Sequence, residues 1–414
     1  MSKPNSLAPL FAIAERAHCH FTDSDGQAFA KFPAGSGFTI LPVRSPEYRD
    51  WFFASYYGDH STIPSAPAFR ALLLHLEAQA DADINRRRFS VYRRVGARGP
   101  NPIPNQILLD LANPRGEFVE ISPSGWCTTT AMNVNFETCR AVEPLPAPQR
   151  APQDGPQNAL DLLPSLLNFA TRADWLRCLV WILSALRPPS VPCPILLLQG
   201  PPSSGKSLAA RILRYLIDPA ALTPIPSSVR QLHTFANQNW ILAFDHVSRL
   251  SPPLCDALCR LSTGAGIALP SSTESATQPI LQCCRRPIVL TVTSRFTCPE
   301  DLAERSLAVN LSPLPPDRRR PELDFQTAFL AARPQILATL CDALSTALRS
   351  LPTLSPITGP HPDALAWAIA AAPSLNCTES ELRESLLSPT SPVPGPSERS
   401  EPLPQPPTPN PPAP

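Results

Sequence analysis

Several residue types and patterns are scarce in this sequence, and each shortage narrows the classes of protein to which the chain can belong. Only three of the 35 basic residues are lysines, and the formal net charge is +1, so overall charge points to no partner. No apolar run reaches the roughly 18 residues of a membrane-spanning helix, so we expect no membrane partner. The twelve cysteines contain no C-x-x-C pair, and scattered thiols of this kind indicate a cytoplasmic location.

Proline is abundant, with 55 residues, and it marks two boundaries along the chain. Residues 143–158 (EPLPAPQRAPQDGPQN) lack hydrophobic periodicity and are predicted to form an exposed linker. Residues 388–414 are rich in proline and have no apolar face, which predicts a disordered tail. We therefore expect an N-terminal α+β domain (1–142), an α/β domain (159–355) and a C-terminal helical extension (356–387).

The two folded regions differ in pattern. In the N-terminal region, residues 66–80 have apolar side chains at helical spacing, and the runs 89–95, 106–111 and 117–121 are typical of short strands. We expect this region to bind DNA or a partner protein. After the linker, residues 159–186 read as helices. Three short apolar runs follow, at 194–200, 240–244 and 287–292. They predict buried parallel strands with helices between them, and therefore an α/β fold.

A glycine-rich loop follows the first of these strands. Gly200-Pro-Pro-Ser-Ser-Gly205-Lys206-Ser207 matches G-x-x-x-x-G-K-[ST] and leads into an amphipathic helical segment. In such a loop, glycines let backbone N–H groups surround phosphate oxygens, the lysine reaches the β- and γ-phosphates, and the serine hydroxyl binds Mg²⁺. The sequence therefore predicts ATP and Mg²⁺ as cofactors. The expected nucleotide contacts are Gly200, Pro201, Pro202, Ser203, Ser204, Gly205, Lys206, Ser207 and Leu208.

The second buried strand is expected to end at Asp245, in the stretch WILAFDHVS. Asp245 could bind Mg²⁺ together with Ser207, or it could simply be the polar end of a buried strand. Because a phosphate loop lies upstream, the Mg²⁺ site is the favoured interpretation. His246 follows, where a glutamate usually orients the attacking water. Whether turnover is fast is therefore left open.

Four segments together carry a family resemblance: LLLQGPPSSGKSLAARILRYLIDP, QNWILAFDHVSRLSPPLCDALCRLSTGAG, RRPIVLTVTS and DLAERSLAVNLSPLPPDRRRPE. Residues 159–350 resemble ATP-binding proteins of phages and integrated mobile elements, in particular the ATPase domains of poxvirus-type and phage primase–helicases related to superfamily 3 and AAA+ proteins. The resemblance implies a P-loop NTPase fold, a homo-oligomeric ring, a DNA partner and a role in DNA replication.

The resemblance also implies residue roles. Lys206 and Asp245 would be catalytic, Thr291 and Thr293 would form the sensor, and Arg305 would be an arginine finger for a neighbouring subunit. For Arg305, an ordinary solvated helix arginine is an equal alternative. The sequence departs from the family at His246, at the threonine sensor, and in a candidate DNA-facing hairpin (GIALPSSTESATQ) that lacks the expected basic residue and acidic run.

One basic cluster is a candidate for nucleic-acid contact: Arg87, Arg88, Arg93 and Arg94, interleaved with Phe89 and Tyr92. Alternating strand positions would present arginines to phosphates and aromatic rings to bases. The alternative is a solvated hairpin with its aromatic side chains in the core.

Three functions follow from these observations. The first is a DNA-dependent, helicase-like ATPase of a phage or mobile element. The second is a slow or non-hydrolysing, ATP-gated oligomeric switch, which the missing glutamate and the lack of a basic residue in the hairpin favour. A small-molecule kinase ranks last, because no arginine-bearing lid segment follows the loop.

Overall fold

The structure is a computed structural model, and it describes most of the chain between residues 7 and 388. Within that span the residues outside the description are 25, 35–36, 83–88, 100–102, 131–133, 139–142, 151–158, 189, 266, 270–279, 283, 315–318 and 320. Arg87, Arg88, the second half of the expected linker and the expected tail beyond Ser388 therefore lie outside the described residues.

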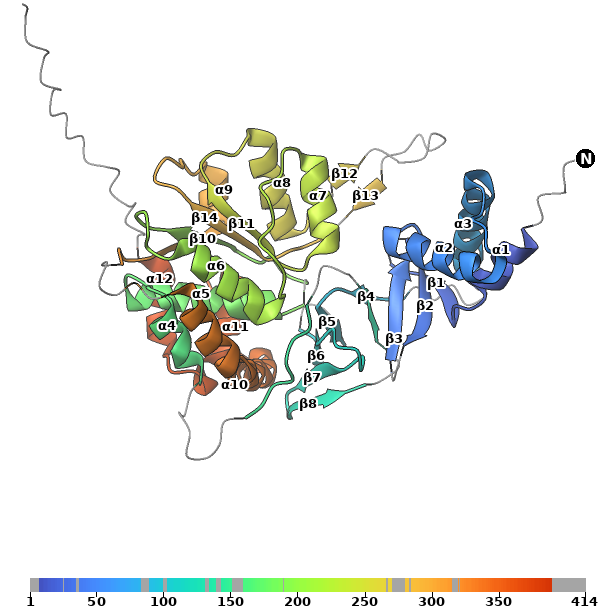
Figure 1. The fold of residues 1–414 in the computed structure, drawn as a ribbon. Coiled ribbons are helices and arrows are strands. Elements are labelled where there is room, and N and C mark those ends of the chain that lie inside the picture. Colours follow the sequence, from blue (N-terminus) through green and yellow to red (C-terminus); the bar gives the residue numbers. More distant parts are fainter. Residues whose placement is uncertain are drawn as a thin grey trace, which may run out of the picture.

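A four-stranded parallel sheet forms the centre of the second half of the chain (Figure 1). Its order is β11-β14-β10-β15, and the bounds are β10 (Ile195–Gln199), β11 (Leu242–Val247), β14 (Ile288–Val292) and β15 (Ser306–Asn310). This confirms the predicted α/β fold with a parallel sheet. Strand β11 does not end at Asp245 as expected. It continues to Val247 through an irregular register after Phe244.

Helices cover both faces of this sheet, because alternate strand residues point to opposite sides. Leu196 and Leu198 of β10 pack in one core with α5 (Arg172–Leu186) and α6 (Lys206–Ile217). Ile195 and Leu197 pack in the other, with α7 (Val229–Gln238) and α8 (Pro252–Thr263). Burial on both faces explains why the strands read as continuous apolar runs.

The first of these cores extends into three C-terminal helices, of which the last two pack on α5 and the first packs on the second. The helices are α10 (Glu322–Ser350), α11 (Pro362–Ala371) and α12 (Glu379–Leu387). Residues 356–387, expected to be a helical extension, thus belong to the same core as the sheet. Short elements complete this half: η1 (Ala159–Asp161), α4 (Leu162–Leu166), α9 (Glu300–Glu304), η3 (Leu351–Thr353), η4 (Ala372–Ser374), β12 (Ile267–Leu269) and β13 (Ile280–Gln282).

The N-terminal region is built from two parts rather than one. Its first part has a core of its own, in which three helices cover an antiparallel sheet of order β1-β2-β3. The elements are α1 (Ala8–Ala14), β1 (Cys19–Thr22), β2 (Ala28–Ala34), β3 (Gly37–Pro42), α2 (Pro46–His60) and α3 (Ala66–Asp81). We call this part the N-terminal unit. The helix expected at 66–80 corresponds to α3.

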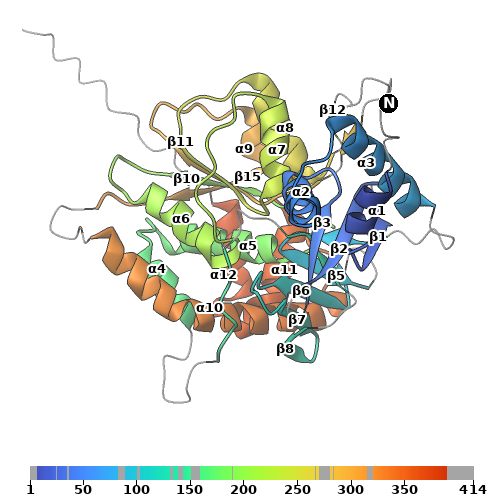
Figure 2. The same cartoon turned by 45° about the vertical axis from the view of Figure 1, so that its right-hand side comes forward.

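The second part is an antiparallel sheet of order β5-β6-β7-β8 that packs against α10 (Figure 2). Ile107, Leu109 and Val119 belong to the same core as the C-terminal helices. Residues 1–142 therefore do not share a single core. The strands are β5 (Val95–Arg98), β6 (Gln106–Asp110), β7 (Phe118–Ser122) and β8 (Gly125–Thr129), beside a short parallel pair of β4 (Val91–Tyr92) and β9 (Asn135–Phe136).

Two further expectations are corrected here. The strand expected over 89–95 is broken, because Arg94 has a φ of 59° and separates β4 from β5. Residues 143–150 contain no helix or strand but are not wholly exposed. Leu145 is buried, and its N–H donates to the carbonyl of Leu111 at 2.9 Å. Within the described ranges, no helix is long and apolar enough to cross a membrane.

Candidate functional site

The loop between β10 and α6 needs glycine at both of its ends. Gly200 has a φ of 149°, and a Cβ there would lie 2.6 Å from the Leu311 carbonyl oxygen and 2.6 Å from Ser204 Oγ. Gly205 has a φ of 89° and immediately precedes the first residue of α6. Since L-residues with a side chain rarely adopt such φ values, the glycine spacing in the sequence reflects a real geometric demand. We call residues 200–207 the glycine loop.

Lys206 holds this loop closed on itself. Its Nζ donates to the carbonyl oxygens of Gly200 and Pro201, each at 2.8 Å. Burial lowers the pKa of Lys206, and the carboxylate of Asp245 partly offsets that effect. The ammonium group thus lies at the N-terminus of α6, where the helix dipole favours anions. Acceptor oxygens of a ligand can replace the two carbonyl oxygens.

Three residues predicted from different strands and loops meet at one carboxylate oxygen. Asp245 Oδ1 accepts from Ser207 Oγ at 2.9 Å and from Thr291 Oγ1 at 2.5 Å. They meet because β11, β14 and β10 are parallel and end at the same edge of the sheet. A carboxylate and hydroxyl groups are oxygen ligands of the kind that Mg²⁺ binds, so the residues present fit this ion.

His246 follows Asp245 directly and contacts this cluster through its backbone. Its backbone N–H donates to Thr291 Oγ1 at 2.7 Å, its φ is 60°, and the residue is exposed. The irregular register of β11 therefore turns the backbone at His246, while Asp245 stays with Ser207 and Thr291. Thr293, the other predicted sensor residue, donates its N–H to the carbonyl of Val247 at 3.1 Å.

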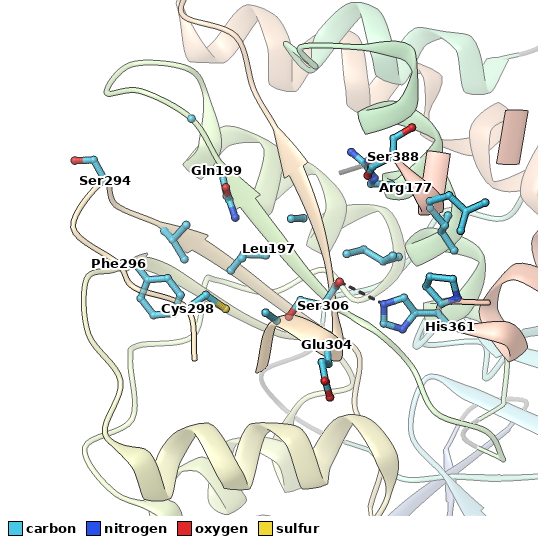
Figure 3. A pocket seen from close by; sticks show the side chains of 18 of the residues that line it. Arg177, Leu197, Gln199, Ser294, Phe296, Cys298, Glu304, Ser306, His361 and Ser388 are labelled. Atoms are coloured by element: carbon cyan, nitrogen blue, oxygen red, sulfur yellow. Dashed lines mark hydrogen bonds between the residues drawn. The ribbon is translucent and has the colours of Figure 1, made fainter. Parts of the chain in front are cut away.

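Cavities lie on both sides of the glycine loop. The first, of about 550 Å³, is lined by Gly200 and Thr293 and also by His361 and Ser388 of the C-terminal segment (Figure 3). There the ring of His361 lies 3.3 Å from the carbonyl oxygen of Ser306. The second, of about 1000 Å³, lies beside Ser203, Gly205 and Leu208. No sequence motif indicated His361, which is distant in the chain from the loop.

Arg305 is not brought to this cluster within one chain. It lies between α9 and β15, and its carbonyl accepts from the N–H of Ile195, the first residue of β10. The glycine loop follows the other end of β10, and a strand rises about 3.3 Å per residue. The side chain is partly exposed and its Nη1 donates to the carbonyl of Asp301 at 2.6 Å.

The two arginines of the predicted basic cluster that the structure describes do not lie on an open surface, and their contact with nucleic acid stays a prediction. Arg94 is buried, pairs with Asp218 at 3.2 Å and donates to the carbonyls of Asp110 and Glu143. Arg93 is ion-paired with Glu137, and its side chain is only 9% exposed. Neither presents the open basic surface that contact with a DNA backbone along a strand requires.

The candidate hairpin is present as two antiparallel strands, β12 and β13. Ile267 pairs with Gln282 and Leu269 with Ile280. The connecting residues 270–279 lie outside the part of the chain that the structure describes. Of the expected segment 266–278 the structure thus describes only β12, whose partner β13 follows the segment, and contact of this hairpin with DNA stays a prediction.

Comparison with known proteins gives a match over the second half of the chain. Residues 160–358 match a family model described as the actinomycete integrative conjugative element replication protein. The match includes the glycine loop, Asp245 and Arg305, and the region is thus similar to a replication protein of a mobile element. This agrees with the mobile-element and replication parts of the resemblance seen in the sequence. No curated protein matches the chain.

Among solved structures, the chain is similar to one titled "The A form apo structure of NrS-1 C terminal region-CTR". The identity is 9% and the TM-score is 0.41, over 82% of this chain and 69% of that chain.

Proposed function

We propose that the chain is a P-loop NTPase that binds ATP with Mg²⁺ at the glycine loop and acts in the replication of a mobile element. The observation that carries this proposal is the convergence of Ser207, Thr291 and Asp245 beside the Lys206 loop. The match to a replication protein of an integrative conjugative element supports the biological role.

In this proposal, Lys206 exchanges its two carbonyl partners for β- and γ-phosphate oxygens, while the loop N–H groups bind the remaining oxygens. Ser207 and Asp245 would hold Mg²⁺, which neutralises phosphate charge when bound. The hydroxyl of Thr291 keeps the Asp245 carboxylate oriented toward Ser207. The larger cavity beside Ser203, Gly205 and Leu208 has room for the base and sugar.

Two modes of action remain to be distinguished, a DNA-dependent motor and a slow ATP-gated switch. Arg305 supports a motor in a ring, because it lies at the opposite end of β10 from the glycine loop and can reach a nucleotide only in a neighbouring copy. His246 supports the switch, because the residue after Asp245 is an exposed histidine and not a carboxylate that could orient water.

Steady-state ATP hydrolysis, measured with and without single-stranded DNA, separates the two modes, with Lys206→Ala as the blank. Turnover that requires Lys206 and rises with DNA would establish the motor. ATP binding that requires Lys206, without DNA-stimulated turnover, would establish the switch. Turnover equal in wild type and Lys206→Ala would contradict the proposal itself.

The role of Arg305 has its own test in the oligomer. For a finger acting between copies, Arg305→Ala lowers turnover by on the order of a thousandfold without lowering ATP affinity, and mixing with Lys206→Ala chains restores part of the activity. Unchanged turnover and assembly in Arg305→Ala would show that Arg305 is an ordinary surface arginine.

A further inference from the structure

A separate cavity of about 320 Å³ lies between the N-terminal unit and the parallel-sheet half of the chain. Its walls come from the start of α2, from β4 and the residue after it, from the end of α7, and from the segment that joins β13 to β14. No residue of the glycine loop lines it, and neither does Asp245. We call this cavity the interdomain cleft.

Arg93 lines the interdomain cleft with unused hydrogen-bond donors. One nitrogen, Nη2, pairs with Glu137, but Nε and Nη1 are buried without a partner in the described structure. The side chain is 9% exposed, so water does not freely solvate these donors. Because buried guanidinium donors are costly to leave unpaired, their position favours an acceptor ligand in the cleft.

Arg286 brings a second positive charge to the same cleft. Its Nε donates to the carbonyl of Ala236 at 2.7 Å, Nη1 donates to that of Arg285 at 2.8 Å, and the guanidinium lies 5.6 Å from the ring centroid of Trp240. Burial lowers the pKa of Arg286, and the nearby charge of Arg93 adds to that effect. An anion between the two guanidinium groups would relieve this repulsion.

The remaining lining limits the size and charge of the ligand. Helix α2 has 15 residues and begins at the cleft, and the positive end of its dipole favours an anion. Three carboxylates also line the cleft: Asp23, Glu47 and Glu137. Glu137 is engaged by Arg93, and Asp23 accepts from the N–H of Gln27. These acids disfavour an extended polyanion and favour a single phosphate group near Arg93.

We propose that the interdomain cleft binds one phosphate group, carried by a free nucleotide or by the 5′ end of a DNA strand, between Arg93 and Arg286. The two unused donors of Arg93, Nε and Nη1, lie on different edges of its guanidinium group, so one phosphate group would accept a charge-assisted hydrogen bond from one of them. Since Arg286 follows β13, a ligand here would connect the N-terminal unit to the base of the β12–β13 hairpin.

The test uses the full chain with Lys206→Ala, so that phosphate binding at the glycine loop does not contribute. Isothermal titration calorimetry measures binding of deoxyadenosine 5′-monophosphate and of a short single-stranded DNA with or without a 5′-phosphate. Adding Arg93→Gln should weaken phosphate-dependent binding by at least about tenfold. Adding Arg98→Gln is the matched control, because it also removes an Arg–Glu pair, with Glu120, outside the cleft.

The two DNA probes and the nucleotide distinguish the sources of the phosphate. Binding of the monophosphate that depends on Arg93 supports a nucleotide, and binding only of 5′-phosphorylated DNA supports a strand end. The double change Arg93→Gln with Glu137→Gln removes the charged pair together and guards against misfolding caused by an unpaired Glu137. Failure of both the monophosphate and the 5′-phosphorylated DNA to bind in the Lys206→Ala chain, or binding of them unchanged by Arg93→Gln, would overturn the proposal.

Discussion

Buried charge is arranged differently at two places in the molecule. One is the ion pair of Arg94 with Asp218, which we call the Arg94 junction, and the other is the carboxyl edge of the parallel sheet. At the junction, Arg94 and Asp218 are each about 1% exposed in their side chains, and Asp218 Oδ2 also accepts from the N–H groups of Trp240 and Ile241. At the sheet edge, Lys206 is bonded to loop carbonyls and lies next to open cavities.

The difference between these two places shows how a charged side chain that stabilises the fold can be distinguished from one that binds a ligand. A buried charge whose hydrogen-bonding groups are all engaged by fixed protein partners has none left for a ligand, so it joins parts of the fold. A charge whose partners are exchangeable and which borders empty space can transfer its hydrogen bonds to a ligand. Arg94 is of the first kind and Lys206 of the second, although both stood in motifs that suggested phosphate contact.

The largest effect expected from this comparison is on stability at the junction. Arg94→Ala leaves Asp218 buried without its ion pair, which costs about 3–5 kcal/mol of unfolding free energy. Denaturant titration measures the loss, and Arg98→Ala, which removes a partly exposed pair with Glu120, should cost no more than about 1 kcal/mol. If the two variants lost equal unfolding free energy, the buried ion pair at the Arg94 junction would contribute no more to stability than the partly exposed pair of Arg98.

A smaller effect is expected at the sheet edge, and only when ligand is present. Wild-type protein should gain about 2.7 kcal/mol of stability from Mg²⁺–ATP at a hundredfold excess over the dissociation constant. Asp245→Asn retains an oxygen acceptor for Ser207 and Thr291 but removes the charge, so it should lose most of the Mg²⁺-dependent part of that gain. Thermal unfolding in the presence of ATP, with and without Mg²⁺, measures this gain in stability. If Asp245→Asn kept the full Mg²⁺-dependent gain, Asp245 would not be a Mg²⁺ ligand.

The smallest effect concerns His233, a buried group with neither a ligand nor a partner. Both ring nitrogens lack a hydrogen-bond partner in the described structure, and burial lowers the pKa of His233 below its ordinary value of 6.5. The unfolded chain therefore takes up a proton first, so stability is retained above about pH 6.5 and falls below it, by at most about 1.4 kcal/mol per pH unit. His233→Phe should flatten the profile between pH 7.5 and 5.5, whereas the exposed His60→Gln should not.

Much of the sheet and of the site could be predicted from local sequence. Strands β10, β11 and β14 are buried on both faces, so each leaves a continuous apolar run. Strand β15 was missed because its residues alternate between buried and partly exposed, and Ser306 and Asn310 interrupt the apolar pattern. The meeting of Ser207 and Asp245 was predicted from the phosphate-loop motif upstream of a buried strand, whereas Thr291 was indicated only by the family resemblance.

Long-range pairing could not be predicted from local sequence. Arg94 reads as part of a basic cluster, and its partner Asp218 lies 124 residues further along the chain. The packing of the sheet β5–β8 in one core with α10 could not be predicted either, because proline-rich residues separate this sheet from α10 in the sequence. Sequence periodicity shows which face is apolar, but not which distant element covers it.

The most direct test of the central claim is the affinity for ATP in the presence of Mg²⁺, measured by calorimetry on the full chain. We expect saturable binding to wild type, loss of at least about tenfold in affinity in Lys206→Ala, and no change in Arg211→Ala, a partly exposed arginine on the same helix. Absence of binding to the wild type, or equal affinity in Lys206→Ala, would contradict a nucleotide site at the glycine loop.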